Sequence, residues 1–87
     1  MKLSIILPVR NESNGIEEAL NLIVSSIVDI DYEIVVINDF SDDASYKIVD
    51  KKVKENNKIR LFNNDKKGLG GAINLGITKS MGGAVCI

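Results

Sequence analysis

The chain has 87 residues, 45% of them hydrophobic, with 11 basic and 12 acidic side chains, a formal net charge of −1, no histidine and one cysteine, Cys86. This length suits one small domain with an apolar core and is too short for two domains. One cysteine excludes an intrachain disulfide, and the lack of histidine removes the usual general base and zinc ligand. The balanced charge gives little support to a nucleic-acid partner. No apolar run reaches the about 18 residues that span a membrane.

The first predicted elements are a strand and a helix. Leu3–Leu7 is a short, continuous apolar run closed by Pro8, which predicts a buried strand. In the polar loop that follows, Asn14 and Glu17 have the spacing of a capping box at a helix start. Apolar residues then recur at helical spacing, and they predict a helix from about 15 to 27.

A second strand and helix follow. Tyr32–Ile37 is apolar without alternation, which is typical of a parallel strand covered by helices on both faces. We expect Ser41 or Asp42 to cap the next helix, which should end near Glu55. A third and shorter strand is predicted at Lys58–Phe62.

A glycine-rich segment, Gly68–Gly71, opens the third predicted helix. We expect Gly76 to let this helix approach the sheet closely, and Gly82–Gly83 to end it. Ala84–Ile87 then predicts a fourth strand. The face expected to pack on the sheet has the spacing i, i+3, i+4, i+7 and consists of Leu69, Ala72, Ile73, Gly76, Ile77 and Ser80.

The predicted order, βαβαβαβ, has crossovers long enough for right-handed parallel units. It predicts an α/β fold: a Rossmann-like, three-layer half with a mainly parallel sheet. Ligands of such sheets bind beyond the carboxyl ends of the strands. Polar loops at 8–15, 38–43 and 63–71 should meet at that edge, and they make it the expected site.

Two of these loops allow a structural and a functional interpretation. The acidic turn at 38–43 is either a solvated turn that caps a helix or a ligand site. The glycine segment is either a tightly packing helix start or a close approach to a nucleotide or sugar. Standard phosphate motifs do not decide between these readings, because G-x-x-x-x-G-K-[ST] is absent and G-x-G-x-x-G fails at Ile73.

Four segments, in order and spacing, resemble the amino-terminal half of the family 2 glycosyltransferases, which have the GT-A fold. The similarity is greatest to the dolichol- and polyprenol-phosphate sugar transferases. SIILPVRNE resembles the opening strand and P-x-x-N-E turn of these enzymes, and EIVVINDFSDDAS resembles their acidic turn, D-D-x-S-x-D-x-[ST]. KKGLGGAINLGI resembles their glycine loop, and SMGGAVCI resembles their A-x-G-D-x-[IV] run. The resemblance implies inverting transfer of a sugar from a nucleotide-sugar (UDP- or GDP-linked) to a lipid-phosphate or saccharide acceptor.

The resemblance also implies which residues bind the nucleotide. Asp39 matches the acid that holds the donor's base or ribose, a task that suits an acceptor-only carboxylate. Asp43 matches a further acid, which we interpret as a helix-terminal residue. The other matching positions flank the base, contact the nucleotide or line its pocket; they are Pro8, Val9, Arg10, Glu12, Lys67 and Gly68.

The sequence departs from the family pattern at several positions. Asn38 replaces the usual first aspartate, Phe40 stands where a small residue is common, Arg10 replaces a frequent tyrosine, and Ala84 replaces an aspartate. The divalent cation of the family, Mg or Mn, is held by a D-x-D motif that is expected shortly after Ile87. Residues 1–87 are therefore expected to be the nucleotide-binding amino-terminal part, truncated before the metal motif, with no catalytic residue and no activity alone.

A rival from another class stays open: a non-catalytic nucleotide-binding module, or one that forms homo-oligomers through an exposed sheet edge or apolar surface. A sugar nucleotidyltransferase is a weaker rival, because Pro8–Glu12 does not resemble its G-G-x-G-T-R-like loop. The lone cysteine and short first apolar run predict a cytoplasmic location. The resemblance adds the cytoplasmic face of a membrane for the full-length protein.

Overall fold

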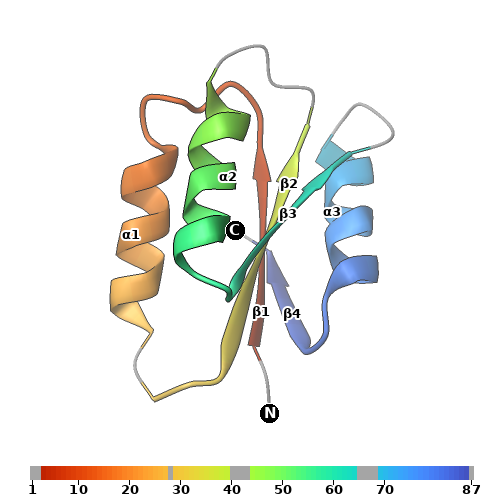
Figure 1. Ribbon diagram of the computed structural model, residues 1–87. Helices are drawn as coiled ribbons and strands as arrows, with labels where there is room; N and C mark the ends of the chain where they lie inside the picture. Colours follow the sequence, from red (N-terminus) through yellow and green to blue (C-terminus); the bar gives the residue numbers. More distant parts are fainter. Residues whose placement is uncertain (1–2, 28, 40–43, 65–68, 87) are drawn as a thin grey trace.

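The computed structural model describes residues 3–27, 29–39, 44–64 and 69–86, with the side chains of 69 and 84–86 left out. A four-stranded parallel sheet of order β3-β2-β1-β4 lies between α1 and α2 on one face and α3 on the other (Figure 1). This three-layer arrangement confirms the predicted α/β fold. The strands are Leu3–Val9 (β1), Tyr32–Asn38 (β2), Ile59–Asn63 (β3) and Gly83–Cys86 (β4), and the helices are Ile16–Ser26 (α1), Ser45–Glu55 (α2) and Leu69–Lys79 (α3).

The sheet buries both of its faces because β2 carries apolar side chains on both. Ile34 and Val36 pack toward α1 and α2, whereas Val35 and Ile37 pack toward α3, and all four are fully buried. Such a strand needs a helical layer on each side, as the uninterrupted apolar run predicted. The larger core, under α1 and α2, also contains Ile5, Val9, Ile16, Leu20, Tyr32, Val49 and Ile59.

Gly76 brings α3 into direct contact with the sheet. A Cβ atom built at this glycine would overlap Cγ2 of Ile6, a fully buried residue of β1. The predicted close approach is therefore confirmed. The buried face of α3 agrees with the prediction at Ala72 and Gly76, but Leu75, which was not predicted, packs on the core, whereas Ile77 is half exposed.

Proline is accommodated inside a central strand. Pro8 does not close β1 as predicted, but pairs with Ile37 of β2 within it. Leu3 and Val9 direct their backbone bonds toward β2, so by alternation Pro8 faces the β4 side. The described β4 ladder ends at the Ile6–Cys86 pair, so the missing N–H of proline interrupts no described bond.

Some of the predicted helix ends differ from the structure, although α2 ends at Glu55 as predicted. The N-cap of α1 is Gly15 and makes no side-chain cap bond, so the capping box of Asn14 does not form. The N-cap of α2 is Ala44, while Ser41 and Asp42, the predicted caps, lie outside the described residues. The helix α3 ends at Lys79, before the predicted stop at Gly82–Gly83, and Gly83 already belongs to β4.

The chain reverses its direction of travel across the sheet at β1. It moves outward from β1 to β2 and β3, and α3 then crosses to the opposite side of β1. The carboxyl ends of β1, β2 and β3 lie together at the top of Figure 1. In sheets of this kind the crevice beside such a reversal is where ligands bind.

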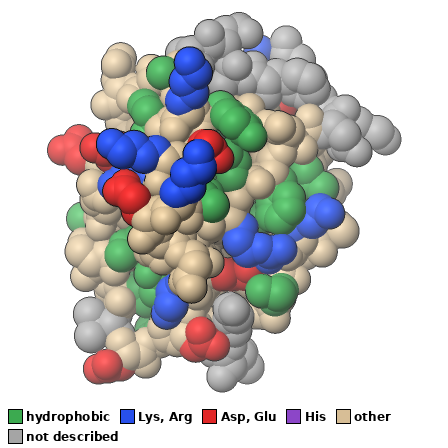
Figure 2. Space-filling view, viewed as in Figure 1, with side chains coloured by type: hydrophobic (Ala, Val, Ile, Leu, Met, Phe, Trp, Pro, Cys, Tyr) green, Lys and Arg blue, Asp and Glu red, His purple; other side chains and the backbone are tan. Residues whose placement is uncertain are grey.

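Charges are mixed on one face of the molecule. Figure 2 shows acidic and basic side chains interspersed on the face formed by α1 and α2. Each of the three helices has 11 residues, and in the described part of the chain none is long and apolar enough to cross a membrane.

Candidate functional site

A buried carboxylate stands at the carboxyl end of β2. Asp39 is only 6% exposed, and its Oδ1 accepts a hydrogen bond of 3.0 Å from Nδ2 of Asn64, which is 5% exposed. A buried charged group is tolerable only when polar partners replace its lost hydration. The amide of Asn64 is such a partner, and it fixes the orientation of the carboxylate.

Backbone bonds continue the sheet one step past the strands and hold this pair in place. The N–H of Asp39 donates to the carbonyl of Val9 at 2.8 Å, and the N–H of Asn64 donates to the carbonyl of Asn38 at 2.9 Å. The ends of β1, β2 and β3 are thereby tied into one rim. Asp39 is held there by rigid elements on both sides.

The loop after β1 meets the same rim. The backbone N–H of Glu12 donates to Oγ of Ser45 at 2.7 Å, which joins this loop to the start of α2. The Glu12 carbonyl accepts from the N–H groups of Gly15 and Ile16 at 3.0 and 2.9 Å, and so begins α1. Asn11 has a φ of 52°, a left-handed conformation that asparagine adopts more readily than most residues.

A pair of amides lies beneath the carboxylate. Nδ2 of Asn38 donates to Oδ1 of Asn63 at 3.1 Å, and these residues face each other in the β2–β3 register. Oδ1 of Asn38 is buried and has no hydrogen-bond partner among the residues that the structure describes. A neutral amide here avoids a second carboxylate beside buried Asp39, because two adjacent acids in this setting would oppose each other's ionisation.

The structure brings three of the predicted binding residues to one edge. Asp39 is buried there, while Arg10 and Glu12 are exposed on the neighbouring loop. The Val9 side chain packs into the core, so only its backbone faces the rim, and Pro8 is half-buried in β1. Lys67, Gly68, Phe40 and Asp43 lie outside the described residues. The binding roles of all these residues stay predictions.

Sequence reasoning gave no role to two residues that build this rim. Asn64 could have been found from the strand register, since it follows Asn63 just as Asp39 follows Asn38. Ser45 stands at the last position of the acidic-turn pattern, and its hydroxyl bonds to a loop 33 positions away. Neither contact leaves a periodic signal in the sequence.

A second buried carboxylate lies near the opposite edge of the sheet. Glu33 of β2 is 1% exposed and accepts hydrogen bonds from the Ser4 hydroxyl and the Met81 N–H, both at 2.6 Å. Arg60 forms an ion pair with it at 2.8 Å and also donates to the Lys79 carbonyl. Burial raises the pKa of Glu33, but the hydrogen bonds and the guanidinium outweigh this and leave the pKa below its ordinary value. This cluster binds β1, β2 and β3 to the turn before β4.

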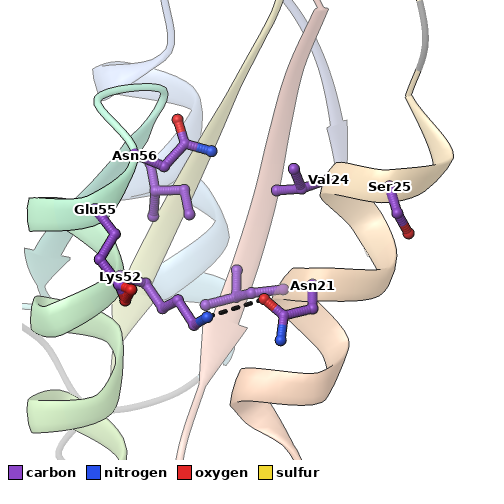
Figure 3. A pocket seen from close by; sticks show the side chains of 8 residues that line it. Asn21, Val24, Ser25, Lys52, Glu55 and Asn56 are labelled. Carbon is purple, nitrogen blue, oxygen red and sulfur yellow. Dashed lines mark hydrogen bonds between the residues drawn. The ribbon is translucent and has the colours of Figure 1, made fainter.

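A cavity of about 190 Å³ lies between α1 and α2, away from the rim. Figure 3 shows side chains of both helices around it, with Nζ of Lys52 donating to Oδ1 of Asn21 at 2.9 Å. Its lining includes Ile59, the first residue of β3, so it lies toward the amino ends of the strands. Its position excludes it from the crevice that the strand order predicts.

The described part of the chain does not fit a metal site. Among the residues that the structure describes, no group of three or more histidine, cysteine, aspartate or glutamate side chains is placed to hold a metal ion. Family 2 glycosyltransferases generally use divalent cations. Because the described residues contain no suitable group of side chains, we assign no cation ligand among them.

Comparison with known proteins gives consistent matches. The chain is 30% identical over 83 residues to a dolichol-phosphate mannosyltransferase of Pyrococcus furiosus, which covers 94% of this chain and 23% of that protein. It is 32% identical over 81 residues to an uncharacterised glycosyltransferase of Rickettsia bellii (93% and 11%), and 30% identical over 78 residues to the glycosyltransferase AglD of Haloferax volcanii (84% and 12%). The chain thus spans less than a quarter of the length of these curated relatives.

The fold has a close counterpart among solved structures. The crystal structure of S. aureus TarS 1–349 superimposes with a TM-score of 0.83 at 25% identity, covering 100% of this chain and 27% of that one. The family model for glycosyl transferase family 2 matches residues 4–87, which is nearly the entire sequence. The chain belongs to glycosyltransferase family 2.

Proposed function

We propose that residues 1–87 bind the nucleotide of a nucleotide-sugar donor, UDP- or GDP-linked, at the rim formed by Asp39, Arg10 and Glu12. The buried Asp39 carboxylate, held by Asn64 at the end of β2, is the observation that carries this proposal. An oriented carboxylate accepts hydrogen bonds from a base N–H or a ribose hydroxyl. Its fixed geometry lowers the entropy lost when a ligand binds.

The loop after β1 would supply the remaining described contacts. The Arg10 guanidinium is exposed beside the rim and can offer either its planar face to a base or its N–H groups to a phosphate. The exposed Glu12 carboxylate can accept from a ribose hydroxyl. Lys67 and Gly68, which match the pocket-lining loop of the family, complete the proposed set.

We propose that the full-length protein transfers the sugar to a lipid-phosphate or saccharide acceptor. An acceptor oxygen forms a bond to the anomeric carbon, and the bond from that carbon to the diphosphate oxygen breaks. The nucleoside diphosphate leaves with the electron pair of that bond. The proton of a saccharide hydroxyl would pass to a carboxylate that acts as general base, whereas an ionised lipid-phosphate oxygen has no proton to lose. The match to the dolichol-phosphate mannosyltransferase of P. furiosus favours the lipid-phosphate. We propose the cytoplasmic face of a membrane as the location of the full-length protein, because a lipid-phosphate acceptor is held in a membrane.

Isothermal titration of the 87-residue chain with UDP and with GDP tests the donor site. Asp39→Asn keeps the shape of the side chain and removes its charge, and it should weaken binding by about tenfold or more, since hydrogen bonds to charged groups are the strong ones. Asp31→Asn is the matched control, because Asp31 is exposed just before the opposite end of β2. Equal affinities of Asp39→Asn and the wild type would refute the assignment of Asp39.

Self-association is the second candidate, favoured by the edge at β4. This strand pairs with β1 on one side, and in the described part of the chain no strand pairs with its other side. Open edges of this kind accept strands of other chains. Ile77 and Met81 add exposed apolar surface at 49% and 63% exposure. Sedimentation over a range of concentrations should show dimers, and a monomer throughout would count against this candidate.

A further inference from the structure

One buried hydroxyl supports the loop that follows β1. Ser45 is fully buried in the first turn of α2, and its Oγ accepts the hydrogen bond from the Glu12 N–H at 2.7 Å. Side-chain oxygens at helix starts commonly cap their own helix. Among the described residues, no side-chain cap bond is found at the N-cap of α2, Ala44, and the oxygen of Ser45 accepts from a loop in a distant part of the sequence.

The backbone of Glu12 is the fixed point of this loop. The Glu12 N–H donates to Oγ of Ser45, and the Glu12 carbonyl, in the next peptide group, accepts from the N–H groups of Gly15 and Ile16 at the start of α1. The residue immediately before it, Asn11, is in the left-handed region with a φ of 52°. Such a conformation persists where surrounding contacts determine it, and it gathers at ligand sites.

Arg10 and Glu12 flank the left-handed residue, and both side chains are exposed at the rim. If the Glu12 peptide were released, the φ of Asn11 would relax and both side chains would sample many positions. A ligand would then have to order the loop as it bound, and its affinity would fall. The Ser45 hydroxyl removes that requirement in advance.

We infer that Ser45 is a positioning residue of the nucleotide site. Its hydroxyl acts through the Glu12 peptide and sets where Arg10 and Glu12 stand, without touching the nucleotide itself. This inference rests on the proposed function, because it takes the nucleotide to meet these two side chains. A merely structural hydroxyl would change stability alone.

The test compares three substitutions in the 87-residue chain. Ser45→Ala removes the acceptor, Ser45→Thr keeps it, and Ser26→Ala removes an exposed hydroxyl that bonds to the Leu22 carbonyl within α1. The measurements are the affinities for UDP and GDP by titration and the hydrogen-exchange rate of the Glu12 amide by NMR. Should the alanine variant fail to fold, Ser45→Cys takes its place, since a thiol is only a weak acceptor.

Ser45→Ala should speed exchange of the Glu12 amide and weaken nucleotide binding by about five- to tenfold, the ratio that one ordinary hydrogen bond supports. Ser45→Thr should restore both values, and Ser26→Ala should change neither. Unchanged affinity in Ser45→Ala, while Asp39→Asn loses binding, would overturn the inference and leave the proposed function standing. Absence of nucleotide binding by the wild type would overturn both, and the exchange rates would then assign the Ser45 bond to structure alone.

Discussion

One buried acid lies where the strands begin, which we call the amino edge of the sheet, and another lies where they end, which we call the carboxyl edge. The surroundings of the two acids differ. At the amino edge Glu33 is enclosed by a hydroxyl, a backbone N–H and a guanidinium that come from β1, β3 and the turn before β4. At the carboxyl edge Asp39 is oriented by Asn64 and lies beside a loop with exposed charged side chains.

The difference shows that burial of a carboxylate does not by itself indicate a ligand site. Glu33 is the more buried of the two, at 1% against 6% exposure, and its partners join four segments of the chain. Such a cluster stabilises the fold. We propose Asp39 as a binding residue because of its place at the strand ends, next to the loop that carries Arg10.

The largest effect is expected from Glu33→Ala. The substitution leaves the Ser4 hydroxyl, the Met81 N–H and the Arg60 guanidinium without their common acceptor. Breaking a buried pair from one side destabilises a protein by about 3–5 kcal/mol, which is a large part of the typical stability of a small domain. Urea unfolding should show this loss, whereas Glu18→Ala, on the exposed surface of α1, should stay close to the wild type. A change below about 1 kcal/mol would mean that the cluster is not a structural support.

A smaller effect, at neither edge, is expected from Gly76→Ala. The added methyl group overlaps Ile6 and pushes α3 away from the middle of the sheet. Overpacking of this kind destabilises by about 1–3 kcal/mol. Gly70→Ala is the matched control in the same helix, because nothing lies within 4 Å of its added Cβ. A gain in stability in both variants would show that α3 has room to move.

Asn64→Ala sharpens the comparison at the carboxyl edge. Removal of the amide takes a buried hydrogen bond from Asp39, and we expect a loss of about 1–2 kcal/mol of stability together with weaker UDP or GDP binding. Asn74→Ala, at an exposed position of α3, should alter neither quantity. If stability falls and affinity does not, Asn64 supports the fold without orienting the carboxylate for a ligand.

The smallest effect is a dependence of stability on pH at the amino edge. The pKa of Glu33 is lower in the folded chain than the ordinary value of 4.5, which the unfolded chain should show. The stabilisation is therefore fully present above pH 4.5 and is lost as the pH falls through the folded pKa. Urea unfolding from about pH 6 to about pH 3 should show a steeper loss in the wild type than in Glu33→Gln. Parallel curves for the two proteins would show that the ionisation of Glu33 does not contribute to the pH dependence of stability.

The order of elements was predictable because it depends on local patterns. The apolar run of β2, the helical spacing in α1 and the glycine at position 76 each gave a correct prediction. Helix ends were predicted less well. The polar residues near them form tertiary bonds instead of caps, as Ser45 shows.

The position of the rim was also predictable, but the way it is held was not. Asp39 follows directly from the end of β2, whereas its partner Asn64 is 25 positions away and becomes a neighbour only through the parallel register. The Glu33 cluster was missed for the same reason. Glu33 is the second residue of β2, and nothing in the sequence around it indicates that it will contact the Ser4 hydroxyl and the Met81 N–H.

The pairing of β4 with β1 has a consequence for how the protein is made. The Gly82 amide and the Ser4 hydroxyl meet across 78 positions, so the first strand gains its second neighbour only after β4 has been synthesised. Contacts of such long range are slow to form. On the ribosome, a nascent chain that has folded only as far as β3 would offer one side of β1 as an open edge, and strands of other nascent chains could add to it before its own partner emerges.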